Sequence, residues 1–434
     1  MTVSLVRFDG SLDSLRRAIE LCDGFAKLRS GDRVLIKPNN SFRHPVMPPY
    51  GMVTTSRIID LIIQSLREHG CGDISIGEGS ITGLLDELKP YTKRGFRGSG
   101  IYKVAAKYGV KLIDFNKGPF EKLDLEGTKV QVCREALETD FLINVPVLKT
   151  HFQTKVSLGF KNMKGCLSKD SKRRFHISNR LEELIALLNE SVVSDLVVID
   201  GIYMLEKGPE TLVGTAYRKD LVMAGTDVFE CDVVATTILG IDPSQVGHLR
   251  VFGQRNSRPF DIGRIETKGE SIERLKEKLE WHFEPDGELL NPAGVTGLSA
   301  PAPGNTLCSG CGATLALALA ILAKDNPNRD FGGAELCYGL ELRPKLDTPN
   351  VLLYGNCALR KNADLRNATR IDGCPPTLSA TLVALMKALL TRPRMLRMMV
   401  MRAIKLVAIR LGIYREMLPR WERYGSTEFD EAHF

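Results

Sequence analysis

The sequence predicts an α/β fold: a mostly parallel layered sheet with helices on both faces, then a smaller cysteine-rich α/β module and a basic amphipathic helical tail. Three observations predict it. Short apolar runs alternate with helical patterns through the first third of the chain, as in a sheet layered with helices. A stretch rich in Pro, Gly and Ala at 286–306 marks a domain boundary. Five of the ten cysteines lie between 308 and 374, beyond that boundary.

The elements of the first part follow in order from the apolar runs. Residues 33–37 (RVLIK) predict a buried strand, and 54–69 predict a helix with a threonine cap and a glycine stop. Further strands are expected at 73–76, 141–145, 196–199 and 221–224, the last followed by a helix through Leu239. Strands joined through crossover helices run parallel. Residues 84–132 break this alternation and indicate an insertion within the first domain. The expected domains are 1–300, 301–390 and 391–434.

Composition and charge exclude several classes of protein. With 43% hydrophobic and 26% charged residues in 434, the chain is neither disordered, collagen-like nor a membrane channel. Charged residues interrupt the first apolar stretch, where a secretory signal needs an unbroken one. We therefore expect a cytoplasmic protein, with peripheral membrane contact as an alternative. In a reducing compartment, ten cysteines indicate thiol or metal chemistry instead of disulfides.

Four cysteines form the most specific pattern. Cys308 and Cys311 make one C-x-x-C pair, and Cys357 and Cys374 are single. Four thiolates complete a 4Fe-4S cluster or a structural zinc site. We favour iron because structural zinc sites usually present two close pairs. In addition, Cys311 and Cys374 precede apolar helical runs, the second through two prolines suited to a first helical turn. Two helix N-termini would stabilise an anionic cluster by about 0.3–1 kcal/mol each. Zinc and four unrelated buried thiols remain alternatives, and we expect Cys337 to be a packing residue or a neighbour of the cluster.

A basic stretch follows the strand at 141–145, where open α/β sheets place their ligands. We expect an anionic small molecule to bind there, unless the stretch is a solvated loop. The candidate ligands in this stretch are Lys149, Lys161, Asn162 and Lys164. Lys37 and Asn39, at the end of the strand at 33–37, join them if the two strands are neighbours. His151 is the candidate catalytic acid or base, with a structural hydrogen-bonding role as the alternative. No nucleic-acid partner is expected, because no aromatic residues are interleaved with the charge.

The tail from 391 to 423 carries basic residues at spacings of three and five around an apolar face rich in Met, Ile and Leu. Such a helix packs on its own protein, lies on an anionic membrane surface or docks on a partner. We expect self-packing first and peripheral membrane contact second.

The segments VLIKPN, INVPVLKTH, KNMKGCL, SKRRFH and DLVVIDGI together resemble the domain of unknown function family 362 (DUF362), over about residues 1–300. The resemblance implies an α/β protein often found beside iron-sulfur modules, with no settled reaction. It marks, without assigned roles, the motif positions Lys37, Asn39, Lys149, His151, Lys161, Asn162, Gly165 and Asp200. Members with an appended ferredoxin domain have tightly spaced cysteines, which this chain lacks. The segments GNC and GCPPT are also locally similar to the small iron-sulfur subunit of complex I and nickel-iron hydrogenases.

Together these patterns predict a 4Fe-4S protein with an anion-binding domain, acting in redox chemistry or electron transfer as an oxidoreductase with a ferredoxin-like electron donor. The alternative is a non-catalytic scaffold with a zinc or iron-sulfur site and a tail that binds a membrane surface or a partner.

Overall fold

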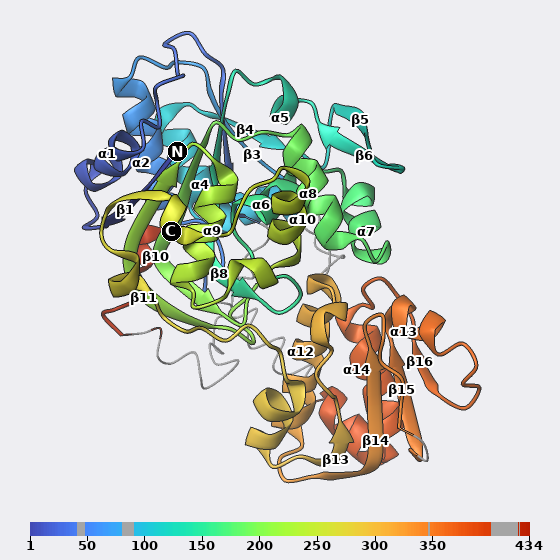
Figure 1. The fold of residues 1–434 in the computed structure, drawn as a ribbon. Helices are drawn as coiled ribbons and strands as arrows, with labels where there is room; N and C mark the ends of the chain where they lie inside the picture. The colour runs from blue at the N-terminus through green and yellow to red at the C-terminus, as the bar shows by residue number, and fades with distance from the viewer. Residues whose placement is uncertain (41–47, 80–90, 346–347, 401–423, 425) are drawn as a thin grey trace. The chain divides into compact units, whose positions relative to one another are not determined.

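The computed structural model describes residues 1–40, 48–79, 91–345, 348–400, 424 and 426–434. The chain divides into two compact units (Figure 1). The N-terminal unit comprises 1–81, 90–281 and 426–434, and the C-terminal unit comprises 82–89 and 282–425. The boundary at 281/282 thus lies just before the stretch expected to be a linker. Residues 426–434, expected to be part of the tail, belong to the N-terminal unit.

A ten-stranded sheet forms the centre of the N-terminal unit, in the order β12-β1-β11-β10-β7-β2-β3-β4, with β8 and β9 extending from β10. Its strands are β1 (Thr2–Arg7), β2 (Val34–Pro38), β3 (Ile74–Glu78), β4 (Lys111–Asp114), β7 (Phe141–Val145), β8 (Val147–His151), β9 (Lys155–Val156), β10 (Leu196–Glu206), β11 (Thr215–Gly225) and β12 (Glu266–Gly269). From β10 through β7, β2 and β3 to β4 every pair is parallel, which confirms the predicted mostly parallel sheet. The β1–β11, β10–β11 and β8–β9 pairs are antiparallel. β10 and β11 need no crossover, because a short connection joins them as a hairpin.

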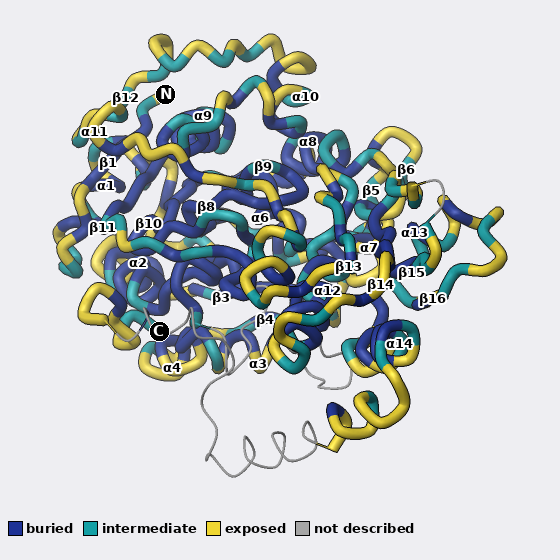
Figure 2. Tube along the Cα trace, turned by 90° about the horizontal axis from the view of Figure 1, so that it is seen from below, coloured by how far each residue is buried: buried dark blue, intermediate teal, exposed yellow. Residues whose placement is uncertain are grey.

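Helices cover both faces of this sheet. Figure 2 shows α2, α3 and α4 on one side and α8, α9 and α10 on the other. The helices of the unit are α1 (Leu12–Leu21), α2 (Ser56–Glu68), α3 (Tyr91–Gly98), α4 (Ile101–Tyr108), α5 (Glu135–Glu138), α6 (Gly159–Asn162), α7 (Lys169–Ile177), α8 (Leu181–Ser191), α9 (Val228–Ile238), α10 (Gly247–Arg255) and α11 (Ile272–Leu275). In α2 the predicted threonine cap is Thr55, whose hydroxyl accepts a hydrogen bond from Ile58 N.

The stretch 84–132 differs from the expected insertion. Its strand β4 pairs with β3 in the main sheet, and α3 and α4 lie between the two strands along the chain. This part therefore continues the strand–helix alternation. Only β5 (Phe120–Leu125) and β6 (Thr128–Cys133) stand apart, as a separate two-stranded sheet. Short, poorly apolar elements concealed the alternation in the sequence.

The C-terminal unit contains a four-stranded sheet in the order β13-β14-β15-β16, and every pair in it is parallel. Its strands are β13 (Thr296–Ser299), β14 (Asp330–Tyr338), β15 (Asn350–Tyr354) and β16 (Thr369–Ile371). Its helices are α12 (Ser309–Asp325), α13 (Gly355–Lys361) and α14 (Leu378–Leu389). Because parallel strands end at one edge of a sheet, the segments that follow β13, β15 and β16 all start from that edge.

Two sequence expectations for this unit need comment. Pro375 and Pro376 precede the cap Thr377 and so lie outside the first turn of α14, which contradicts the expectation that they start the helix. The Thr377 hydroxyl accepts a hydrogen bond from Ala380 N and takes the capping role. In the tail, residues 392–400 are helical, and 401–423 lie outside the described residues.

Candidate functional site

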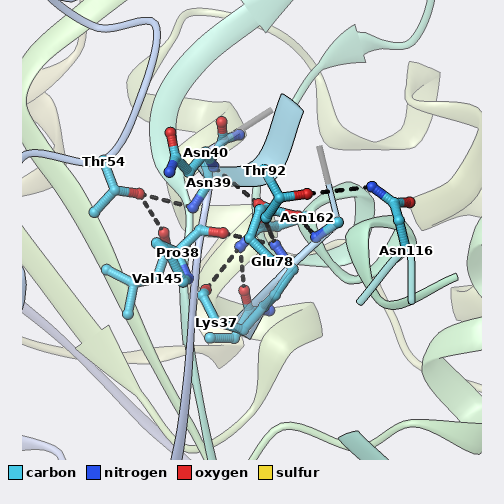
Figure 3. Close-up of polar contacts among 12 residues, drawn as sticks. Lys37, Pro38, Asn39, Asn40, Thr54, Glu78, Thr92, Asn116, Val145 and Asn162 are labelled. Carbon is cyan, nitrogen blue, oxygen red and sulfur yellow. Dashed lines mark hydrogen bonds and ion pairs between the residues drawn. The ribbon is translucent and has the colours of Figure 1, made fainter. Parts of the chain in front are cut away.

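A buried ion pair joins the carboxyl ends of β2 and β3 (Figure 3). Lys37 Nζ donates to Glu78 Oε2 at 2.8 Å, to Pro38 O at 2.6 Å and to Asn162 Oδ1 at 3.1 Å. Glu78 also accepts from Asn40 N at 2.9 Å and from its neighbour Gly79 N at 2.7 Å. The Lys37 side chain is completely buried. Of the candidate anion ligands, Lys37 is therefore paired with Glu78, and Asn162 is hydrogen-bonded to Lys37.

The ends of β2 and β7, which were expected to face one another if the strands are neighbours, do lie side by side. β2 pairs with β7 in parallel, and β8 begins two residues after β7 ends. Lys149 on β8 reaches Asn39 Oδ1 at 3.4 Å and Met52 O at 2.7 Å. Its side chain is 1% exposed. Burial lowers the pKa of Lys149 to about 7, with Lys37 adding to the shift and Glu78 opposing it.

Beyond this ion pair lies a concentration of basic side chains, which we call the basic cluster: Lys149, His151, Lys161, Lys164 and His176. Burial and the neighbouring lysines hold the pKa of His151 well below its ordinary value. Burial, with Lys164 and Lys161, does the same to the pKa of His176. Both imidazoles are thus neutral at pH 7.

Lys161 is the member of the basic cluster whose amine is left open. Its side chain is 8% exposed, and its Nζ has no hydrogen-bond or ion-pair partner within the described ranges. Burial lowers its pKa well below the ordinary lysine value, and Lys164 and Lys149 lower it further, whereas Glu182 opposes the shift. A lysine held in this way gains a favourable interaction as soon as an anion enters.

His176 offers a second open group. Lys164 Nζ lies 2.5 Å from His176 Nε2. With Lys164 as donor, the ring proton is on Nδ1, and this buried nitrogen has no partner among the described residues. Buried polar groups are nearly always paired in native proteins. The basic cluster therefore holds a buried donor without an acceptor beside an amine without a partner.

Asp232 positions the short helix that carries Lys161. Its two carboxylate oxygens accept from Gly159 N at 2.8 Å and from Phe160 N at 2.9 Å. Burial raises the pKa of Asp232 to about 7, and these hydrogen bonds oppose the shift. The side chain of Asp232 is fully buried in α9, so α6 is fixed against that helix.

Asp200 lies outside the basic cluster and has a structural role. Its carboxylate accepts from Thr55 N at 2.7 Å and from Ile202 N at 3.1 Å, at the start of α2. Burial raises its pKa to about 6. Asp227 caps α9 through Glu230 N. Both aspartates therefore accept hydrogen bonds from backbone N–H groups near the start of a helix.

In the C-terminal unit, four cysteines follow the carboxyl edge of the parallel sheet. Cys308 is the N-cap of α12, Cys311 is in its first turn, Cys357 is in α13 and Cys374 follows β16. The loops of the last two are joined, since Asn356 N donates to Gly373 O at 2.9 Å and Gly373 N to Asn356 Oδ1 at 2.8 Å. Each of the four side chains is partly exposed.

Two of the four thiols have a pKa that the neighbouring thiols raise. A hydrogen bond with Cys308 raises the pKa of Cys311 well above its ordinary value, and burial and the nearby Cys374 and Cys357 raise it further. Burial raises the pKa of Cys357, with Cys308 and Cys374 adding to the shift and Arg360 opposing it. Cys337 lies in β14 and is fully buried.

Across the described residues, no three His, Cys, Asp or Glu side chains form a group that could hold a metal ion as they stand. None of the described helices has the length and apolar character needed to cross a membrane.

Sequence reasoning missed Glu78, His176 and Asp232. Glu78 stood inside a glycine-rich strand end, and a lysine buried on the adjacent strand was the signal that an acid had to face it. His176 closed the basic motif SKRRFH but carried no pattern of its own. Asp232 lies in a helix that is buried nearly throughout, where an acidic residue needs a specific partner.

Comparison with known proteins agrees with the family resemblance that the sequence motifs indicate. Residues 34–237 match the model of the family described as "Domain of unknown function (DUF362)". This match supports membership of the DUF362 family. The chain is also 28% identical over 260 residues, 56% of its own length and 76% of the relative's, to a protein named thylakoid-associated protein from Synechocystis sp..

Among solved structures, the chain is similar to the lactate racemase apoprotein from Thermoanaerobacterium thermosaccharolyticum. The sequence identity is 13% and the TM-score 0.36, over 59% of this chain and 57% of that one. A similarity this limited carries no information about activity.

Proposed function

We propose that this chain is an iron-sulfur protein whose DUF362 domain binds a small anion, and that it acts in redox chemistry or electron transfer. The observation that carries the proposal is the set of four cysteines at one edge of the C-terminal sheet, in which the neighbouring thiols raise the pKa of Cys311 and of Cys357. Mutual repulsion of this kind is relieved when a metal centre binds the four thiolates.

The donor types are those of a 4Fe-4S cluster. Cys308, Cys311, Cys357 and Cys374 supply the four thiolates that such a cluster needs. The cluster with its thiolates is anionic, and the first turns of α12 and α14 begin near these cysteines. Each helix N-terminus favours negative charge by about 0.3–1 kcal/mol. When bound, the cluster would supply one-electron transfer, with a ferredoxin-like protein as the electron donor.

Cys374→Ser, purified without oxygen, tests the ligand set. We expect it to lose most of the bound iron and the brown colour. Cys337→Ser is the matched control, because it removes a buried thiol of the same unit that is not in the set. Equal iron in Cys374→Ser and the wild type would remove Cys374 from the ligands. A colourless wild-type protein with one zinc would replace the cluster with a structural zinc site.

The anion is proposed to bind at the basic cluster. The open Nδ1 of His176, a buried atom without a partner among the described residues, supports this proposal. Lys161, whose side chain is 8% exposed and whose Nζ makes no hydrogen bond within the described ranges, supports it too. Lys149 and Lys164 supply further positive charge. His151 remains a candidate acid or base, whereas Lys37, Asn39 and Asn162 act by positioning the lysines.

A thermal-shift titration with inorganic phosphate and with propanoate tests the anion site. We expect stabilisation of the wild type by at least one of them, and a loss of most of that shift in Lys164→Met. Lys268→Met is the matched control, since Lys268 is exposed on β12. Equal shifts in Lys164→Met and the wild type would contradict an anion site at the basic cluster.

The non-catalytic alternative has one observation in its favour. In the helical segment 392–400, Leu396, Met399 and Val400 are 62%, 47% and 51% exposed, and the exposed Arg392, Arg394 and Arg397 accompany them. A basic apolar surface of this kind binds anionic lipid. Sedimentation with vesicles that contain anionic lipid, compared with neutral vesicles, tests it. Binding that Leu396→Asp does not weaken would contradict a membrane role for this helix.

A further inference from the structure

The open amine of Lys161 is surrounded by positive charge inside the protein. Lys164 and Lys149 both act on it, and Glu182 is the acid that opposes them. The other titratable neighbours, His151 and His176, are neutral imidazoles at pH 7. A lysine that is desolvated beside other cations is a primary amine able to attack carbon, which an exposed lysine is not at neutral pH.

Other buried lysines of the domain differ from Lys161 in one respect. Lys37 donates to three oxygens, and Lys149 donates to a carbonyl and an amide oxygen. Lys172 donates to Gly79 O at 2.5 Å and to Asn116 Oδ1 at 3.3 Å. Each of these nitrogens donates to at least two oxygens of the protein. The Lys161 nitrogen has no such contact within the described ranges.

We propose that Lys161 is a nucleophile that forms an imine with the carbonyl carbon of a small 2-oxo acid, whose carboxylate is held by Lys149 and Lys164. This inference deepens the proposed anion site and rests on it. It assigns the anion to the class of compounds that carry a ketone or aldehyde next to a carboxylate.

The step balances without an oxidant or a reductant. The Lys161 nitrogen forms a bond to the carbonyl carbon while the carbonyl oxygen takes up a proton. The resulting hydroxyl takes up a second proton and leaves as water, while the nitrogen gives up both of its protons and forms the C=N bond of the imine. The Lys164–His176 pair, 2.5 Å apart, acts electrostatically on Lys161 and is proposed to deliver and recover that proton.

Trapping by reduction tests the proposal on the full chain. The protein is incubated at pH 7 with pyruvate and cyanoborohydride, and adducts are mapped by peptide mass spectrometry. We expect more than about tenfold more adduct at Lys161 than at exposed lysines, because their amines are almost entirely protonated at this pH. Lys161→Arg should lose this adduct, whereas Lys155→Met, which changes a partly exposed lysine, should keep it.

Thermal shifts with pyruvate and with propanoate, which has the carboxylate but no ketone, separate the two claims. If pyruvate stabilises the protein and no adduct forms at Lys161, the imine is wrong and the anion site survives. If neither acid stabilises the protein and no adduct forms, both the imine and a carboxylate site at the basic cluster are wrong. Mapping in the wild type decides the question even if Lys161→Arg fails to fold.

Discussion

Lys37→Met should strongly destabilise the N-terminal unit. The substitution keeps most of the side-chain volume and removes the charge that faces Glu78. Glu78 is 3% exposed, and it keeps two backbone donors, Asn40 N at 2.9 Å and Gly79 N at 2.7 Å.

The size of the effect follows from what remains buried. Removing one partner of a buried ion pair costs about 3–5 kcal/mol, because the other charge is left without compensation. The two remaining N–H donors stabilise the Glu78 carboxylate in part, so we expect a value toward the lower end of this range. Lys37→Met combined with Glu78→Gln should lose less than the sum of the single changes, since the double variant leaves no isolated charge.

Urea unfolding followed by tryptophan fluorescence measures these losses. The chain has two tryptophans, and a Trp421→Phe background leaves Trp281 of the N-terminal unit as the reporter. Lys268→Met is the control, because its ion pair with Glu266 is solvent-exposed and such pairs contribute little. A loss in Lys37→Met no larger than in Lys268→Met would refute the view that this pair anchors the strand ends.

Three further outcomes follow from the same contacts. Gly165→Ala should destabilise the protein non-additively with Lys37→Met, as measured in urea, since a Cβ there would lie 2.6 Å from Lys37 Cε. Affinity for phosphate should fall as pH rises through about 7, where Lys149 loses its proton, and Lys149→Arg should flatten this dependence in a calorimetric titration. Affinity falls with rising pH because Lys149, with its lowered pKa, loses its positive charge near pH 7. A bound anion favours the charged form and therefore raises the pKa of Lys149. Phe429→Ala should cost about 3–5 kcal/mol in the same unfolding assay, because Phe429 is 7% exposed and stacks on Tyr203.

Much of the sheet was predictable because its strands are buried on both sides. β2 and β7 are mostly apolar in sequence because every position of both strands is buried. β4 was missed because its four residues, Lys111–Asp114, lie at the sheet edge, are for the most part incompletely buried and carry two charges. Periodicity reports burial, so an exposed edge strand leaves a weak signal.

The basic cluster was predictable in part. The chain order placed Lys149, Lys161 and Lys164 on one stretch after a strand, and strand pairing brought them to the β2 end. Which lysine is open depends on contacts from far along the chain. Lys37 is neutralised by Glu78, 41 residues away, and no local pattern records such a pairing.

The composition of the chain likewise predicted the four-cysteine set, but not its place. Parallel pairing of β13, β14, β15 and β16 brings segments 66 residues apart, from Cys308 to Cys374, to one sheet edge. Spacing along the chain cannot reveal this, because the strand order arises from tertiary packing. The donor types alone therefore left zinc and iron open.

The most direct test of the proposed function is the metal and acid-labile sulfide content of the wild-type protein purified without oxygen, together with the electron paramagnetic resonance spectrum after reduction. A 4Fe-4S centre predicts about four irons and four sulfides per chain and a spectrum from the reduced cluster. A protein with one zinc, or with iron that Cys308→Ser and Cys374→Ser both retain, would contradict it.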